Sequence, residues 1–401
     1  MTAKLYHQNG CTQCEAAVLD CRANADGTFD ILLDCTAIYP EGGGQLSDTG
    51  YIGPSRCTHA RDDGGEIWHR CDKPIEIGQS VHVAADEAVR LDHTQQHTGE
   101  HMLSGLAHSM FGCTNVGFHM ADDIVTVDFD KPLSAEQIAE LELKVNEAIQ
   151  RDEPTRTITV TPEEYETIEI RKKAKGLKGE ITVVYAGGVD SCTCCGTHCQ
   201  SAGQVGVLKI LSHMNYKGGI RIGFVCGMRA VLSMQQDGAR MDAIARRFST
   251  SADKAVDAVI KQGDELAAMK REFKQRTDML LDYRAKELAE KSELCGKTRA
   301  VVTMEEGLEA NELGFLCEKL CACGNMVAVV LAQKGENLSY RVARSADVAL
   351  SMRELIQAVN ALFGGKGGGR DDSAQGSARL SGSAKDSVEQ LKAYVYRRIK
   401  G

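Results

Sequence analysis

Two short motifs bring together the residue types that bind a metal ion. His97 and His101 lie four residues apart in a segment predicted to be helical, so both imidazoles are on one helical face. Further along the chain, Cys194 and His198 have the same spacing. Three imidazoles and one thiolate form a tetrahedral donor set that suits zinc. The sequence therefore predicts that these four residues bind Zn²⁺.

The chemistry of such a site depends on how many ligands stay bound. If all four residues bind the ion directly, zinc orients a substrate or holds the fold. If one ligand moves away, the ion can lower the pKa of a bound water to about 7 and supply a nucleophile. Both interpretations agree with the sequence.

A zinc peptidase is a second interpretation of the helical motif. His97, Glu100 and His101 fit the pattern H-x-x-E-H, in which the glutamate is the general base. The pattern fixes only three residues, so chance matches are common. It also leaves Cys194 and His198 without a role.

A glycine-rich turn in the N-terminal region is a candidate ligand-binding loop. Three consecutive glycines, residues 42–44, remove side chains, so the backbone can approach a ligand closely. Most glycine triplets are flexible turns. The flanking Tyr39, Gln45 and Asp48 make a binding loop the favoured interpretation.

A second glycine-rich loop lies near the C-terminus. The segment Gly364–Gln375 contains Lys366 and Arg370, and this composition suits a phosphate or a terminal nucleotide. It is not a P-loop, because no serine or threonine follows Lys366.

The helices and strands that must position these residues are expected to form an α+β fold, divided into four parts along the chain. Residues 1–88 alternate short apolar runs with turns, which indicates a small β-barrel. Residues 89–230 combine helices and strands around the metal motifs. Residues 231–295 are predicted to form a helical coiled-coil linker, and residues 296–401 a second α+β domain.

The predicted linker carries a seven-residue apolar repeat. Val259, Leu266, Phe273 and Leu280 are spaced as in a coiled-coil seam. A homodimer would give this pattern, and so would a hairpin of two helices within one chain.

The composition is that of an ordinary soluble protein, with 43% hydrophobic and 26% charged residues in 401. There is no apolar run of membrane-spanning length and no signal peptide, so we expect a cytoplasmic protein without a membrane partner. The 16 cysteines are then expected to be ligands or core residues rather than disulfides. Residues 1–230 carry 20 Lys and Arg against 32 Asp and Glu, and residues 231–401 carry 27 against 24. A polyanion would therefore be bound mainly by the second half.

Taken together, the motifs resemble the editing domain of alanyl-tRNA synthetases, and most closely the free-standing alanyl-tRNA editing proteins of the long AlaX type. The resemblance rests on the segments Tyr39–Gln45, His97–His101 and Cys194–His198. The loop Gly364–Gln375 resembles the C-terminal domain of the same synthetases. The matched segments span the chain in order and leave no room for an aminoacylation core, which implies editing in trans.

The resemblance implies a hydrolase that deacylates mischarged Ser-tRNA(Ala) and, less efficiently, Gly-tRNA(Ala), with Zn²⁺ as cofactor. Residues 89–230 would be the editing domain and residues 296–401 the tRNA-binding domain. In the family, a hydroxyl at the position of Thr36 contacts the seryl side chain. The expected catalytic residues are Thr36, Gln45 and Glu100. The expected substrate-binding residues are Tyr39, Gly42, Gly43, Gly44, Asp48, Lys366 and Arg370, and the expected metal ligands are His97, His101, Cys194 and His198.

One departure from the family pattern leaves the thiolate ligand ambiguous. Cys195 stands where the synthetases have glycine, so two thiols are adjacent. Only Cys194 is four residues from His198, and it is therefore the favoured ligand.

The chemistry of editing agrees with these motifs. A pocket for alanine cannot strongly exclude glycine, or serine, which merely adds a hydroxyl, so errors must be removed by hydrolysis. A second site that hydrogen-bonds the hydroxyl can select serine, because leaving a buried donor unpaired costs about 1–3 kcal/mol. A non-catalytic tRNA-binding protein with a structural zinc is the remaining alternative.

Overall fold

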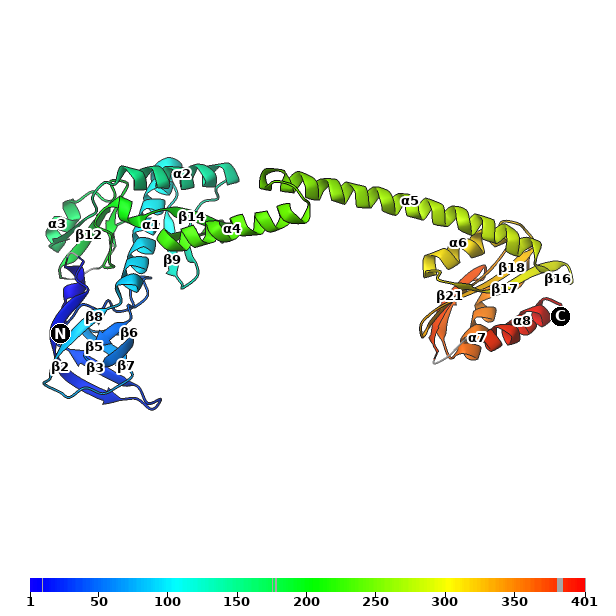
Figure 1. Cartoon of the computed structure of the whole chain (residues 1–401), viewed down its shortest axis with the longest axis horizontal. Coiled ribbons are helices and arrows are strands. Elements are labelled where there is room, and N and C mark those ends of the chain that lie inside the picture. The colour runs from blue at the N-terminus through cyan, green and yellow to red at the C-terminus, as the bar shows by residue number, and fades with distance from the viewer. Residues whose placement is uncertain (9, 175, 177–178, 381–384, 401) are drawn as a thin grey trace. The chain divides into compact units, whose positions relative to one another are not determined.

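The computed structural model of the chain divides into two compact units, Met1–Ile244 and Ala245–Gly401 (Figure 1). The described residues are 1–8, 10–174, 176, 179–380 and 385–400. None of the described helices combines the length and the apolar character that a membrane crossing needs. The cytoplasmic location expected from the sequence stays a prediction.

A closed β-barrel forms the N-terminal part of unit 1. Its strands are β2 (Gln13–Ala23), β3 (Phe29–Leu33), β5 (Gly50–Ile52), β6 (Ser55–Asp63), β7 (Glu66–Cys71) and β8 (Ser80–Ala85). Around the barrel they follow the order β2-β3-β7-β6-β5-β8. Inward and outward residues alternate, as in β8, where Val81, Val83 and Ala85 are buried. The closed β-barrel expected in the N-terminal region is confirmed, whereas its expected bounds, residues 1–88, stay a prediction.

A short strand pair leads from the barrel to the glycine loop. β1 (Ala3–Lys4) pairs in parallel with β4 (Cys35–Thr36), and η1 (Leu5–His7) follows β1. Thr36 therefore lies at the end of a paired strand, directly before the loop.

The rest of unit 1 is an α+β arrangement around the long helix α1 (Glu87–Phe111). The strands are β9 (Asn115–Met120), β10 (Val125–Phe129), β11 (Arg156–Val160), β12 (Ile181–Ala186), β13 (Asp190–Thr193), β14 (Leu208–Tyr216) and β15 (Gly219–Cys226). They form one sheet with the order β14-β15-β10-β9 and a smaller one with the order β11-β12-β13. The other helices are α2 (Ala135–Arg151), α3 (Pro162–Thr167), η2 (Ala202–Val205) and α4 (Gly227–Arg247).

Helix α1 packs unusually close to both sheets because it contains two glycines. A Cβ on Gly99 would lie 2.2 Å from Cys226 Sγ, and a Cβ on Gly105 would lie 2.3 Å from the carbonyl oxygen of Val189. A glycine inside a helix costs about 1 kcal/mol relative to alanine. Here it allows the helix to contact β15 of one sheet and β13 of the other. The helix ends at Gly112, whose φ is +65°.

Unit 2 is a sheet covered by helices on both faces. Its strands are β16 (Glu293–Cys295), β17 (Thr298–Glu306), β18 (Met326–Lys334), β19 (Asn337–Arg344), β20 (Lys366–Gly369) and β21 (Ser373–Arg379). Its helices are η3 (Ala252–Lys254), α5 (Ala255–Glu290), α6 (Ala310–Cys321), α7 (Met352–Phe363) and α8 (Lys385–Lys400). The strand order is β16-β17-β18-β19-β21-β20. The second α+β domain expected from the sequence is confirmed, whereas its expected bounds, residues 296–401, stay a prediction.

Alternate residues of β18 show how the two faces of this sheet are covered. Val327 and Val329 belong to a core with α7 and α8, whereas Ala328 and Val330 belong to a core with α6 and the end of α5.

The predicted linker is divided between the two units. Most of α4 belongs to unit 1, whereas α5 belongs to unit 2 and packs against α6 through Leu281, Ala285 and Leu288. The four residues of the seven-residue repeat lie on α5 and are 47–70% exposed. No described element of unit 2 covers them. A partner for this stripe therefore stays a prediction.

Candidate metal centre and active site

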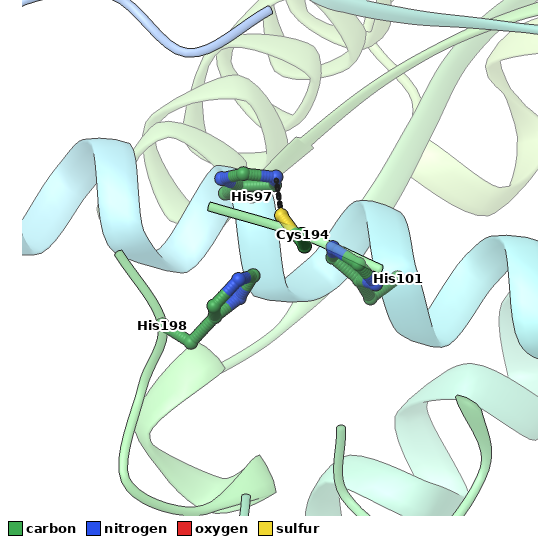
Figure 2. Close-up of side chains that lie close together, drawn as sticks. All are labelled: His97, His101, Cys194 and His198. Carbon is green, nitrogen blue, oxygen red and sulfur yellow. Dashed lines mark hydrogen bonds between the residues drawn. The ribbon is translucent and has the colours of Figure 1, made fainter. Parts of the chain in front are cut away.

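The four predicted ligands converge at one place in unit 1 (Figure 2). His97 and His101 project from α1, and Cys194 and His198 come from the segment that follows β13. One ligand atom of each residue lies within 4.8 Å of the others, and Cys194 Sγ is 3.4 Å from His97 Nε2. Cys195 is exposed and lies outside this group, so the geometry favours Cys194 as the thiolate ligand.

The donor set fits a metal ion. Both ring nitrogens of His198 are buried and have no hydrogen-bond partner among the described residues. Buried polar atoms are nearly always paired, so this imidazole needs a ligand. A cation between His198, Cys194 and the two imidazoles of α1 would supply one. Three nitrogens and one sulfur are donors that zinc prefers.

The electrostatics of the group favour positive charge at its centre. Burial opposes ionisation of Cys194, but the neighbouring imidazoles hold the pKa of its thiol well below the usual value. Burial also favours the neutral form of His101, but Cys192 and Asp190 raise the pKa of this imidazole well above its usual value. The surroundings therefore stabilise a thiolate next to a positive charge. Either a protonated imidazole or a bound divalent cation can provide that positive charge.

Gln45 connects the glycine loop to the metal centre. Its Oε1 atom is 2.8 Å from His97 Nδ1 and also accepts the Thr197 amide at 3.0 Å, while its Nε2 donates to Thr197 Oγ1 at 2.8 Å. Because the amide oxygen can only accept, His97 carries its proton on Nδ1. The Nε2 atom of His97 is then left free for the metal.

Two glycines allow the loop and the Cys/His segment to approach His97. A Cβ on Gly44 would lie 2.5 Å from the ring of Phe118, which stacks on His97 with 5.5 Å between ring centroids. A Cβ on Gly196 would lie 2.1 Å from His97 Cε1. Any side chain at either position would therefore push apart the walls of the site.

An open cavity of about 430 Å³ lies beside the glycine loop. Its lining includes the loop residues Gly42, Gly43, Gly44 and Gln45 together with His59, Arg61 and His119. None of the four candidate metal ligands lines the cavity, but Gln45 both lines it and contacts His97, so one side chain separates the cavity from the ligand group.

The glycine loop is anchored to α1 through Asp48. The Asp48 carboxylate is fully buried, accepts the Tyr39 amide at 2.8 Å and forms an ion pair with Arg90. Arg90 also donates to the Ala37 carbonyl at 2.6 Å, and the Tyr39 hydroxyl donates to the Gly42 carbonyl at 3.1 Å. These contacts position the loop. Direct contacts of Tyr39 and Asp48 with a substrate stay predictions.

The hydroxyl of Thr36 is oriented by His69. The Ile31 carbonyl, 3.2 Å from His69 Nδ1, can only accept, so Nδ1 carries the proton. Burial lowers the pKa of His69 to about 4, which keeps the ring neutral at pH 7. Its Nε2 then accepts the Thr36 hydroxyl at 2.9 Å, while the Ile38 amide donates to Thr36 Oγ1 at 3.1 Å. One acceptor site remains on Oγ1, but Thr36 is fully buried, so a substrate can reach it only if neighbouring residues move.

The remaining expected residues are not members of this group of candidate ligands. Glu100 is buried in α1, where its carboxylate accepts hydrogen bonds from Ser104 and Asn115, each at 2.5 Å. Lys366 and Arg370 are exposed in unit 2, on β20 and directly after it. The roles assigned to these three residues stay predictions.

Several contacts of the site were missed by sequence analysis. Thr197 lies inside the Cys194–His198 motif and could have been found as a neighbour of two ligands. Arg90 and Asp190 carry no local signal, because their partners Asp48 and His101 are 42 and 89 residues away.

Comparison with known families gives two matches. Residues 296–400 match the DHHA1 domain. Residues 181–222, which include Cys194 and His198, match the threonyl and alanyl tRNA synthetase second additional domain.

Curated relatives extend the similarity to nearly the whole chain. The chain is 28% identical over 399 residues to the alanyl-tRNA editing protein AlaX-L of Pyrococcus horikoshii, and the match covers 94% of each chain. The chain is therefore similar to a long alanyl-tRNA editing protein along almost its full length. It is also 31% identical over 237 residues to the alanyl-tRNA editing protein Aarsd1 of Rattus norvegicus, over 58% of each chain. It is 25% identical to an alanine–tRNA ligase of Psychrobacter cryohalolentis, over 91% of this chain and 44% of the ligase.

Two similar solved structures each match part of this chain. The C-Ala domain from Aquifex aeolicus alanyl-tRNA synthetase is 23% identical with a TM-score of 0.26, over 27% of this chain and 98% of that one. RecJ from Thermus thermophilus is 16% identical with a TM-score of 0.27, over 39% of this chain and 22% of that one.

Proposed function

We propose that this chain is a hydrolase that removes serine, and less efficiently glycine, from mischarged tRNA(Ala). The observation that carries the proposal is the contact of Gln45 with His97, because it joins the glycine loop and the metal centre in one site. A relative of similar length bears the name of an alanyl-tRNA editing protein, which supports the same activity. The tRNA would be charged by a separate synthetase, so the chain acts in trans.

The proposed reaction is hydrolysis of an aminoacyl ester. Water adds to the ester carbonyl, the bond between the acyl carbon and the ribose oxygen breaks, and the amino acid and the free tRNA 3′ end are released. Zinc held by the four grouped residues would orient the ester and polarise its carbonyl. Gln45 contacts His97 and also lines the cavity beside the glycine loop, so it would connect an ester bound there to the metal ligands.

Selectivity for serine is assigned to Thr36. The Thr36 hydroxyl donates its hydrogen bond to His69 Nε2, so Oγ1 is presented to a substrate as an acceptor. A seryl hydroxyl can donate to this atom, whereas a glycyl group cannot. The neighbouring residues must move for this contact, which costs free energy. We expect serine to be favoured because its hydrogen bond to Thr36 Oγ1 offsets this cost, whereas glycine forms no such bond.

We assign the contact with the tRNA body to unit 2. β20 is an edge strand of three glycines and Lys366, so its backbone and the exposed Arg370 beside it are accessible to phosphates. The excess of positive charge in residues 231–401 agrees with this assignment.

We assign the apolar stripe of α5 to a second copy of the chain. The stripe repeats every seven residues and is 47–70% exposed, and two such helices can pair as a coiled coil. Contiguous apolar surface is uncommon on monomers, which favours a homodimer.

The peptidase alternative is not favoured by any specific contact. Glu100 would have to face a substrate as general base, yet its carboxylate is buried and bonded to Ser104 and Asn115. A non-catalytic tRNA-binding protein remains the competing interpretation, and it is an outcome of the test below.

The test is ester loss from Ser-tRNA(Ala), Gly-tRNA(Ala) and Ala-tRNA(Ala) in the presence of the purified protein, with and without a chelator. We expect rapid loss of the serine ester, slower loss of the glycine ester, survival of the alanine ester, and inhibition by the chelator. Cys194→Ala should abolish hydrolysis, whereas Cys195→Ala, which removes the exposed neighbouring thiol, should not. Survival of all three esters with the metal bound would refute hydrolysis and favour the binding protein.

A further inference from the structure

A buried ion pair lies behind His101, on the side of the ring away from the metal ligands. Asp190 is the first residue of β13, and its side chain is fully buried. Its Oδ2 atom is 2.9 Å from His101 Nδ1 and 2.9 Å from Arg171 Nη2, while its Oδ1 accepts from Arg171 Nε. The Arg171 side chain is only 9% exposed.

The donors and acceptors in this chain of contacts determine where the proton of His101 lies. A guanidinium can only donate, so both oxygens of Asp190 act as acceptors. His101 Nδ1 must therefore donate to Asp190 Oδ2, so Nε2 is the ring nitrogen that can bind a metal in place of a proton. Cys192 Sγ also lies 3.2 Å from Nδ1, but sulfur is a weak acceptor, so the carboxylate is the dominant partner.

The three imidazoles of the centre differ in which group accepts a hydrogen bond from the ring. His97 donates to the neutral amide of Gln45, and His198 has no partner among the described residues. His101 alone donates to a carboxylate, and that carboxylate is itself held on both oxygens by Arg171. His101 is therefore the most firmly oriented of the three rings.

The fold brings this pair to the metal helix by means of a glycine. A Cβ on Gly105, one turn after His101 in α1, would lie 2.3 Å from the Val189 carbonyl oxygen and 2.8 Å from Asp190 Cβ. Only a residue without a side chain allows β13 to start so close to α1. The Asp190 carboxylate consequently reaches His101 without a bridging water.

We propose that Asp190 and Arg171 are positioning residues of the metal centre, which fix the ring orientation and the tautomer of His101 so that its Nε2 is preset for the metal. This inference rests on the zinc site of the proposed function and extends it to residues outside the four ligands. Partners of this kind change metal affinity by about 10–100-fold in other proteins.

The test is zinc affinity, measured by competition with a chromogenic chelator on the full-length chain without tRNA. We expect Asp190→Asn to bind zinc about 10–100-fold more weakly than the unmodified chain, because the amide must turn one donor toward Arg171 or toward His101. The matched control is Asp128→Asn, which breaks a similar fork with Arg221, at 2.6 and 2.7 Å, on strands away from the metal. The control should bind zinc within about twofold of the unmodified chain.

Two further variants keep the proposal falsifiable if circular dichroism shows that Asp190→Asn does not fold. Arg171→Lys retains the charge but removes the fork, and its zinc affinity should fall between those of the unmodified chain and Asp190→Asn. Cys192→Ala should leave the affinity unchanged. Equal affinity of Asp190→Asn or Arg171→Lys and the Asp128→Asn control would overturn the positioning role alone. Failure of the unmodified chain to bind zinc would instead refute the metal site of the proposed function.

Discussion

Two imidazoles of the candidate metal centre, those of His97 and His101, are oriented by the contact that Nδ1 makes. His97 donates to Gln45 and His101 donates to Asp190, so both present Nε2 to the same point. A neighbouring group also orients the Thr36 hydroxyl, which donates a hydrogen bond to His69. At the scale of single residues, the chemistry therefore depends on where protons are placed.

Thr36→Val is expected to reduce the preference for Ser-tRNA(Ala) over Gly-tRNA(Ala) by about tenfold. The substitution keeps the side-chain volume but removes the acceptor for the seryl hydroxyl, and a hydrogen bond of this kind contributes about 1–1.5 kcal/mol. The measurement is kcat/KM for both substrates. Thr36→Ser retains the hydroxyl and should keep the preference. An unchanged preference in Thr36→Val would show that serine is recognised elsewhere.

His69 predicts a pH dependence for the stability of the barrel. Its pKa is about 4 in the folded chain, against about 6.5 when unfolded, so the unfolded state binds the proton more strongly. The stabilisation is complete above pH 6.5 and declines by about 1.4 kcal/mol per pH unit as the pH falls toward 4. His69→Gln does not titrate, and its stability should decline less over this range.

Trp68 provides the measurement for this prediction. It is the only tryptophan, is 3% exposed and precedes His69 on β7, so its fluorescence reports unfolding of the barrel in urea. Midpoints are compared between pH 7.5 and pH 5 for the unmodified chain and for His69→Gln. Parallel declines in the two proteins would exclude His69 as the titrating group.

At the scale of elements, close approach explains how the site is assembled. α1 supplies two ligands, but its glycines decide how near the sheets can come, since β13 and β15 pack directly on the helix backbone. The glycine loop is tied to the same helix by the Asp48–Arg90 ion pair. Helix α1 thus carries two ligands and contacts the glycine loop and both sheets.

Helix α5 predicts a homodimer. Phe273→Glu places a charge in the apolar stripe and should convert a dimer to a monomer, because a buried unpaired charge is strongly unfavourable. Sedimentation equilibrium on the full chain measures the mass. Gln275→Glu adds the same charge at an exposed position of α5 two residues after Phe273, outside the seam, and should leave the dimer intact. A monomeric unmodified chain would exclude the second copy as the partner of the stripe.

At the scale of the whole molecule, hydrolysis and tRNA binding are assigned to different units. The metal centre lies in unit 1, whereas Lys366 and Arg370 lie in unit 2. The first 230 residues are acidic and the rest are slightly basic, which agrees with this division.

The double variant Lys366→Ala/Arg370→Ala tests the division. It should weaken tRNA binding and lower the slope of log affinity against log salt by about 0.7–0.9 for each phosphate that the protein no longer neutralises. The ester cleavage rate at saturating tRNA should stay close to that of the unmodified chain. Lys297→Ala, at another exposed site of unit 2, serves as the charge control. An unchanged salt slope in the double variant would place the tRNA-binding surface elsewhere.

The sequence by itself determined the features that depend on local periodicity. The four-residue spacing of His97 and His101 gives a common face wherever that segment is helical, because the helix repeats every 3.6 residues. Short apolar runs that alternate with turns likewise indicated the barrel, and the spacing from His198 favoured Cys194 over Cys195.

The tertiary structure decided what depends on elements far apart in the chain. Asp190 meets His101 across 89 residues, and His69 meets Thr36 across 33. No local pattern encodes these contacts, because they arise only once β13 packs on Gly105 and the barrel closes. The exposure of the α5 stripe was also beyond the sequence, since an apolar repeat is the same whether or not another helix covers it. Hydrogen-bond partners and burial exist only in the packed chain. They determine which ring nitrogen or hydroxyl carries the proton, and the residue types alone do not.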